Sequence, residues 1–297
     1  MPPEVTPARL RSRRLWRRIR SVAALLPPMG FQWLRHLLWH GEVLPISRPR
    51  THTHHIYLKM ARDRDPLLTV TSDKFALRAH VEGRLGPGHL PELYAVLDSP
   101  DDLLSLSLPP RYVVKATHGS GMTALVTGDD AATRSKLVER ARKWLALPYW
   151  RKNGEWGYRG IRPRLVVEEL LDAGDGEVPP DWKFLCFGGK AALVQVDFDR
   201  FTGHTRNFYD PDGRPVSLRM HYPQGPRIPL PPSFGRMREL AEQLAKDFDF
   251  VRVDLYALAH DRIVVGELTH YPTGGNKSFD PPEWDAKLGA LWPRRGL

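Results

Sequence analysis

The chain has 297 residues, enough for one large domain or two to three small ones. Cys186 is its single cysteine, so disulfides and thiolate metal sites are excluded and a reducing, cytoplasmic location is expected. The net charge of +10 lies mostly in residues 1–50, whose ten Arg and two Glu contribute +8. The basic character therefore belongs to the N-terminus, and an anionic partner is one interpretation of it.

Two amphipathic helices are predicted in this basic segment, over residues 8–26 and 31–40. Apolar residues recur at helical spacing, with Arg on the other faces, and Pro27-Pro28 separates the two. Such helices could lie on a membrane surface, at the inner face of the membrane, or pack on the main body as an arm. The apolar runs are too short for a transmembrane helix, and no specific nucleic-acid partner is predicted. A Pro/Arg-rich linker is predicted over Pro45–Thr53.

The rest of the chain mixes β-hairpins with helices. Helices are predicted after Ser72 through Val81, from Ser99, and over 131–147, 231–248 and 284–291; strands are predicted over 93–97, 112–116, 123–127, 165–171, 182–187, 191–197, 250–258 and 262–268. This order predicts an α+β fold and not a doubly wound parallel sheet. The expected divisions are a basic helical arm over 1–48, a substrate region over 49–110, a small ATP-binding lobe over 111–172 and a C-terminal lobe over 173–297.

A lysine and a glycine loop stand at the first predicted hairpin. Lys115 ends a β-rich run and is followed by His118-Gly119-Ser120-Gly121. Glycines let backbone N–H groups approach phosphate oxygens, and lysine supplies a positive charge. The spacing is neither that of a P-loop nor that of a dinucleotide-binding loop. A hairpin turn that merely contains glycine stays an alternative.

Charged residues in apolar strands mark three further positions. Glu168 and Glu169 end an apolar strand, where they are either an exposed strand end or acceptors for ribose hydroxyls. Lys183 lies inside an apolar strand and must either extend to solvent or find an anion.

The sharpest signal is a pair of acids on the last predicted hairpin. Asp254 and Glu267 are 13 residues apart, each in an otherwise apolar strand. A divalent cation would offset the cost of burying them, and oxygen ligands suit Mg²⁺. A salt bridge from Arg252, which shares a strand face with Asp254, is the alternative.

In this order, these motifs resemble the ATP-grasp superfamily, and in more detail its TupA-like family. The resemblance covers residues 49–292. Its most specific part is the stretch from Arg200 to Asp210; other matching stretches include Asp73–Arg78, Lys115–Gly121, Asp181–Phe187, Val251–Tyr256 and Gly266–Thr269.

The resemblance implies that two α+β lobes enclose ATP. It implies nucleotide contacts from Lys74, Lys115, His118, Gly119, Ser120, Gly121, Glu168, Glu169 and Lys183, with the 118–122 loop as a lid. It implies Asp254, Glu267 and Thr269 as Mg²⁺ ligands. The candidate catalytic residues are Arg252, Lys115 and Lys183, and the candidate substrate ligands are Arg200, His204, Arg206, Asn207, Gly274, Gly275 and Lys277.

The implied reaction joins a small-molecule or peptide carboxylate to an amine through an acylphosphate. The same nucleotide apparatus could serve a kinase that phosphorylates a hydroxyl, and a membrane-surface binding protein with a degenerate nucleotide site is a further alternative. The histidines of Thr51–His55 suggest zinc, but with no cysteine nearby and no spaced partner in the sequence they are interpreted as an ordinary loop.

Overall fold

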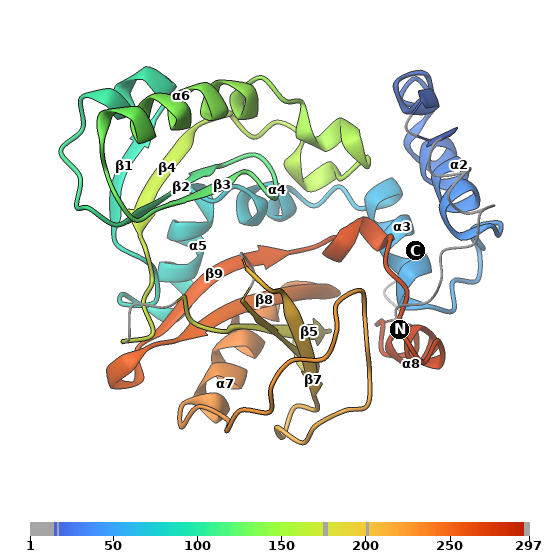
Figure 1. Cartoon of the computed structure of the whole chain (residues 1–297). Helices are drawn as coiled ribbons and strands as arrows, with labels where there is room; N and C mark the ends of the chain where they lie inside the picture. The colour runs from blue at the N-terminus through green and yellow to red at the C-terminus, as the bar shows by residue number, and fades with distance from the viewer. Residues whose placement is uncertain (1–14, 17, 175–177, 200–201, 294–297) are drawn as a thin grey trace.

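The computed structural model describes residues 15–16, 18–174, 178–199 and 202–293. Two antiparallel sheets form its frame (Figure 1). The small sheet has the strand order β1-β4-β2-β3, and the large sheet has the order β7-β6-β5-β8-β9. The strands are β1 (Leu93–Leu97), β2 (Tyr112–Ala116), β3 (Thr123–Val126), β4 (Leu165–Glu169), β5 (Asp181–Phe187), β6 (Lys190–Phe198), β7 (Thr205–Tyr209), β8 (Phe250–Ala257) and β9 (Ile263–Thr269).

Helices cover both sheets. The α-helices are α2 (Pro28–His40), α3 (His52–Arg62), α4 (Pro66–Ser72), α5 (Ala76–Leu85), α6 (Ala131–Leu145), α7 (Phe234–Ala245) and α8 (Glu283–Ala290). Short 3-10 helices span Pro100–Leu104, Tyr149–Lys152, Trp156–Tyr158, Ala259–Asp261 and Pro272–Gly275. Figure 1 shows α6 on the small sheet, α7 against the large sheet, and α4 and α5 between the two sheets.

The large sheet is buried on both faces because its central strand is apolar at nearly every position. Phe184 and Cys186 of β5 pack in a core with α5 and α7. Leu185 and Phe187 point to the opposite face and pack in a second core with α3 and α8. Successive side chains of a strand alternate between faces, so one strand supplies both cores.

The small sheet has a core of its own under α6. Leu137, Val138 and Ala141 of that helix pack on Tyr112 and Val114 of β2. The helix begins at Asp130, whose carboxylate accepts a hydrogen bond of 2.6 Å from the backbone N–H of Thr133. Such a cap satisfies a donor that the first helical turn leaves unpaired.

The predicted hairpins and the α+β class are confirmed, but three elements were missed. One is α4, because the helix predicted after Ser72 corresponds to α5 alone. The predicted linker over Pro45–Thr53 is wrong at its end, because α3 already begins at His52. The side chain of Thr51 caps this helix by accepting a hydrogen bond of 3.1 Å from His54 N. Strand β7 was not assigned either: its residues were identified only as part of a family signature.

The second N-terminal helix packs on the body of the protein. Phe31, Gln32, Arg35 and His36 of α2 are buried. The chain before α2 is helical over 18–23, and residues 8–14 and 17 of the first predicted helix lie outside the described residues. No helix among the described residues is long and apolar enough to cross a membrane.

Candidate functional site

A row of polar side chains crosses the large sheet in register. Gln195 of β6 lies opposite Lys183 of β5, Lys183 lies opposite Asp254 of β8, and Asp254 lies opposite Glu267 of β9. Residues that pair directly across strands point to the same face. Four strands therefore present one line of charged and polar groups on the same face of the sheet.

Asp254 and Glu267 meet at the guanidinium of Arg252. Arg252 Nε donates to Asp254 Oδ1 at 2.7 Å, and its Nη2 donates to Asp254 Oδ2 at 2.6 Å and to Glu267 Oε1 at 3.1 Å. Thr269 adds its hydroxyl, which donates to Glu267 Oε1 at 3.1 Å. The salt bridge that the sequence left open as an alternative is present, and it joins Arg252 to both acids.

The oxygen groups of this cluster also fit a magnesium site. Asp254 is 1 % exposed, and Glu267 and Thr269 stand beside it on β9. Two carboxylates and a hydroxyl on one face are the hard donors that Mg²⁺ takes. A dication at these oxygens would take the place of the positive charge that Arg252 brings to them. Magnesium binding here stays a prediction.

Lys183 is paired with anions, which is one of the two alternatives that its place in an apolar strand left open. It is 2 % exposed, and its Nζ donates to Asp254 Oδ2 at 2.6 Å and also to Asp181. Asp197 Oδ2 lies 4.0 Å away. A buried lysine must be paired to remain charged, and these carboxylates hold its ammonium beside the acid pair.

The small sheet contributes a second charged group. Lys115 Nζ donates to Glu168 Oε2 at 2.7 Å, and Arg78 Nη1 of α5 donates to Glu168 Oε1 at 3.1 Å. Glu169 instead accepts two hydrogen bonds of 2.7 Å from Arg262. These hydrogen bonds from Arg262 lower the pKa of Glu169, against the effect of burial. Ribose binding at either acid stays a prediction.

Lys74 links the two sheets. Its Nζ donates to the carbonyl oxygen of Gly119 in the glycine loop. Burial lowers the pKa of Lys74, while the charge of Glu267 from the large sheet raises it and the charge of Lys115 from the small sheet lowers it. The lysine therefore lies within electrostatic reach of both sheets, at the edge of the glycine loop.

Within the glycine loop, the predicted residues have different surroundings. His118 is buried, and its Nε2 lies 3.2 Å from the carbonyl oxygen of Leu147, away from solvent. A Cβ at Gly119 would lie 2.5 Å from the ring of Tyr149, so only glycine fits there. Gly121 has φ +75°, a conformation that glycine adopts without strain. Ser120 is exposed and lines a cavity.

The predicted substrate ligands on β7 are occupied by other parts of the protein. Arg206 donates to both oxygens of Asp197, at 2.5 and 3.0 Å, and Asn207 bonds the backbone of Gly225 and Pro226. His204 Nε2 lies 3.3 Å from Asp197 Oδ1. None of the three lines the cavity beside Glu267. Arg200 lies outside the described residues, and substrate binding at these positions stays a prediction.

The predicted substrate loop after β9 is held by the N-terminal arm. Arg35 of α2 donates to the carbonyl oxygen of Gly274 and, at 2.7 Å, to Asn276 Oδ1. His40 Nε2 lies 2.9 Å from the carbonyl oxygen of Gly275. Lys277 Nζ lies 3.0 Å from the ring nitrogens of His221. The loop therefore depends on a helix that is far from it in sequence.

The sequence reasoning missed two groups of residues. Asp181, Asp197 and Arg78 complete the charged clusters, and Glu155 is buried in the cavity wall. The acid at the start of β5, two residues before Lys183, was a readable signal, because residues two apart share a strand face. Glu155 had none, because it lies in a segment without strand or α-helical periodicity.

The interpretation of Thr51–His55 as an ordinary loop without a partner is wrong, because its histidines form the first turn of α3. His54 comes together with His36 and Glu42, and the ligand atoms of the three residues all lie within 4.8 Å of one another. His36 belongs to α2 and Glu42 follows it, so only the packing of the arm brings them to α3.

The chain is similar to one protein family and, more weakly, to several solved structures. The TupA-like ATP-grasp family profile matches residues 54–292. A search of curated proteins found no significant match. Among solved structures, a D-alanine–D-alanine ligase from Bacillus anthracis is 16 % identical with a TM-score of 0.41, over 68 % of this chain and 57 % of its own.

Two other solved structures are similar at the same level. The VanG D-Ala:D-Ser ligase from Enterococcus faecalis is 13 % identical with a TM-score of 0.43, over 68 % of this chain and 52 % of its own. The N5-carboxyaminoimidazole synthase from Aspergillus clavatus is 10 % identical with a TM-score of 0.40, over 83 % of this chain and 51 % of its own. The matches span about half the length of these enzymes. The profile, which covers most of the chain, decides the family: the protein belongs to the TupA-like ATP-grasp family.

Proposed function

We propose that the protein is an ATP- and magnesium-dependent carboxylate–amine ligase that forms an amide through an acylphosphate. The observation that carries the proposal is the charged row Lys183–Asp254–Glu267 on the large sheet, which Lys74 connects to Lys115 of the small sheet. Lysines from both sheets near the acid pair of the large sheet suit a nucleoside triphosphate and its Mg²⁺ ion. Membership of the family supports the same assignment.

In the first step, a carboxylate oxygen of the substrate attacks the γ-phosphorus of ATP, and ADP leaves. Lys115 and Lys183 would stabilise the negative charge on the phosphates. Mg²⁺ held by Asp254 and Glu267 would neutralise charge on the transferred group. Bringing a phosphate to Lys183 would replace part of its present pairing with Asp181 and Asp254.

In the second step, an amine attacks the acyl carbon of the acylphosphate and inorganic phosphate leaves. Arg252 lines a cavity together with Glu267 and Thr269, and the part of the cavity that these three residues line is called its metal end, after the predicted Mg²⁺ site. Its guanidinium could stabilise the tetrahedral oxyanion or the departing phosphate, because arginine binds such groups with two parallel hydrogen bonds. The reaction needs no side-chain nucleophile.

An ADP-release screen tests the proposal. The full chain is incubated with Mg·ATP and a set of carboxylic acids, each combined with a set of amines. A ligase releases ADP and phosphate when acid and amine are both present. Release of ADP with one acceptor alone, and recovery of a stable phosphorylated product, would assign a kinase instead. Asp254→Asn serves as the inactive reference, and Glu283→Gln, at an exposed position of α8, as the active one.

A further inference from the structure

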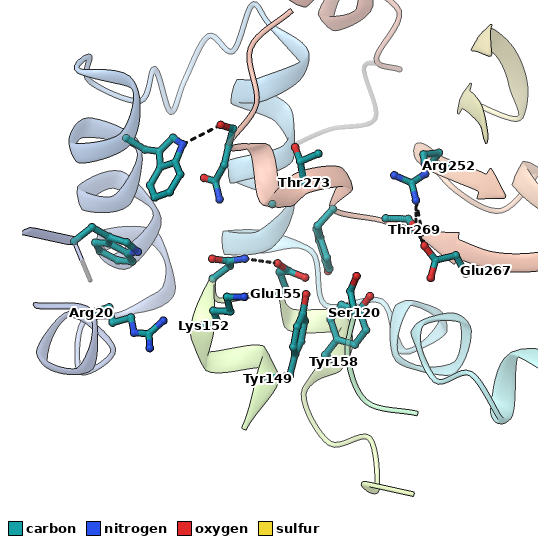
Figure 2. Close-up of a pocket in the computed structure, with 16 residues that line it drawn as sticks. Arg20, Ser120, Tyr149, Lys152, Glu155, Tyr158, Arg252, Glu267, Thr269 and Thr273 are labelled. Atoms are coloured by element: carbon teal, nitrogen blue, oxygen red, sulfur yellow. Dashed lines mark hydrogen bonds and ion pairs between the residues drawn. The ribbon is translucent and has the colours of Figure 1, made fainter. Parts of the chain in front are cut away.

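A cavity of about 380 Å³ lies between the N-terminal arm and the metal end of the site. Glu267, Thr269 and Arg252 line its inner end, and Trp16, Arg20 and Trp39 of the arm line its outer end. Figure 2 shows Glu155 between these two groups, with Lys152 and Arg20 on one side and Glu267 on the other.

Glu155 is an unusual wall residue because it is a buried carboxylate with little compensation. It is 4 % exposed. Its Oε1 accepts a hydrogen bond of 2.7 Å from Asn153 Nδ2, which is the only hydrogen bond that the described residues give to this carboxylate. An uncompensated buried charge is costly, so a carboxylate kept in this place calls for a cationic ligand.

The backbone of the substrate loop closes one side of this carboxylate. A Cβ built at Gly274 would lie 3.3 Å from Glu155 Oε1, and 3.0 Å from both Asn153 Nδ2 and Arg35 Nη2. Arg35 itself is turned to the carbonyl oxygen of Gly274 and to Asn276. Arg35 of the arm therefore holds the loop next to Glu155, but it forms no ion pair with Glu155.

Three tyrosines line the cavity together with Glu155: Tyr149, Tyr158 and Tyr271. Burial raises the pKa of each of them, and the charge of Glu155 adds to the rise. The rings of Tyr149 and Tyr158 meet edge to face at 4.9 Å. A cavity wall with a carboxylate and tyrosine rings is a suitable site for an ammonium group, which both attract.

The same tyrosines connect Glu155 to the metal end. The charge of Glu267 also raises the pKa of Tyr149 and Tyr158, and Tyr149 shares a hydrogen bond with Ser120 of the glycine loop. A small amine held at Glu155 would thus face the inner end of the cavity. At the outer end, Arg20 and Lys152 provide positive charge for an acidic group.

We propose that this cavity binds the amine substrate, with Glu155 receiving its ammonium group and Arg20 and Lys152 receiving an acidic group, so that the acceptor is of the amino-acid type. The inference rests on the proposed ligase function. Glu155 first takes one proton from the ammonium group, which frees the electron pair of the nitrogen. In the amide-forming step the nitrogen–carbon bond forms and the bond from carbon to the phosphate oxygen breaks. Phosphate leaves with the electron pair of the broken bond and takes the second proton that the nitrogen loses.

Glu155→Gln separates the two halves of the reaction. The first half is measured with Mg·ATP, a set of carboxylic acids and hydroxylamine, which traps an acylphosphate as a hydroxamate. The second is measured as amide formed with α-amino acids and with matched amines that lack the carboxylate. We expect hydroxamate formation close to wild type and amide formation reduced by about 100-fold, the usual loss for a missing general base. Glu283→Gln is the matched control, and melting temperatures confirm that both variants fold.

Two outcomes would overturn the inference. An equal loss of hydroxamate and amide would make Glu155 a purely structural residue, and unchanged amide formation would give it no role. Amine binding is measured separately, from the rise in melting temperature with the same amines and no acid. Wild type should respond, to amino acids more than to matched amines, and Glu155→Gln should not.

The binding experiment also separates the two proposals. A response to amines without any hydroxamate would disprove the ligase function and leave the amine subsite standing. Hydroxamate formation without any response to amines would support the ligase function and disprove the subsite.

Discussion

Asp254 and Glu267 are direct cross-strand neighbours on β8 and β9, and Arg252 donates a hydrogen bond to each. The arginine occupies the position between two acids that a metal would also favour. Metal binding would therefore loosen a contact that the protein already makes, and Arg252 would become available to an oxyanion. This exchange explains how one residue can be both the salt-bridge partner and a candidate catalytic group.

Asp254→Asn and Glu267→Gln should each reduce Mg·ATP turnover by at least about 100-fold, because each removes a charge from the predicted metal site. The fold should persist, since Lys183 keeps Asp181 as a partner and Arg252 keeps the other acid. ADP release measures turnover and circular dichroism checks the fold. Wild-type turnover in either variant would refute the metal site.

Lys183→Met and Lys115→Met should differ in stability. Lys183→Met leaves two buried aspartates without their shared cation, a change that costs about 3–5 kcal/mol in such pairs. Lys115 is half-buried, and in Lys115→Met the guanidinium of Arg78 still pairs with Glu168, so this variant should lose less stability. Urea denaturation measures the free energy of unfolding, and ATP titration should show weaker binding in both variants. Equal free energies of unfolding in the two variants would contradict the pairing of Lys183 with Asp181 and Asp254.

Arg206→Met should change how stability depends on pH. Burial acts to raise the pKa of Asp197, but hydrogen bonds and charge from Arg206, with Lys183, hold that pKa well below its usual value of 3.8. A depressed acid contributes stability above its unfolded pKa and loses it as pH falls through the folded one. The melting-temperature gap between wild type and variant should therefore be largest at neutral pH and shrink below about pH 4. A gap that does not vary with pH would contradict this.

Glu155→Gln should have the opposite pH dependence. Burial raises the pKa of Glu155 above 4.5, while the hydrogen bond from Asn153 and the charges of Arg35 and Lys152 oppose the rise. A raised acid stabilises the fold below its unfolded pKa and loses that contribution as pH rises through the folded one. The variant should therefore gain melting temperature relative to wild type as pH rises above about 4.5. A constant difference from pH 4 to 8 would contradict a carboxyl group whose pKa burial raises.

Truncations should divide the arm into two parts. Val22 and Leu25 are 69 % and 84 % exposed, so we expect removal of residues 1–26 to weaken binding to anionic liposomes and to leave the main body folded. Removal of residues 1–44 also deletes Arg35 and its hold on Gly274, which should lower the melting temperature by several degrees. Liposome and nucleic-acid binding that is unchanged in the shorter truncation would refute the anchor hypothesis.

The sequence by itself determined the hairpins and the acid pair. Strands β5 and β6 are joined by Gly188-Gly189, and β8 and β9 by five residues, three of them in a 3-10 helix, so alternation and turn chemistry were enough to pair them. Because a hairpin is local, the 13-residue spacing already placed Asp254 and Glu267 on neighbouring strands.

Only the tertiary structure decided which charges meet. Arg78 and Glu168 are 90 residues apart, and Arg35 and Gly274 are 239 residues apart; no periodicity relates such positions. The same holds for Glu155, which lies beside Gly274 and within reach of the charge of Arg35, both from other parts of the chain. Hydrophobic patterning selects the elements, but pairing of buried charges depends on how those elements pack, because each charge takes whichever opposite group the packing brings within reach.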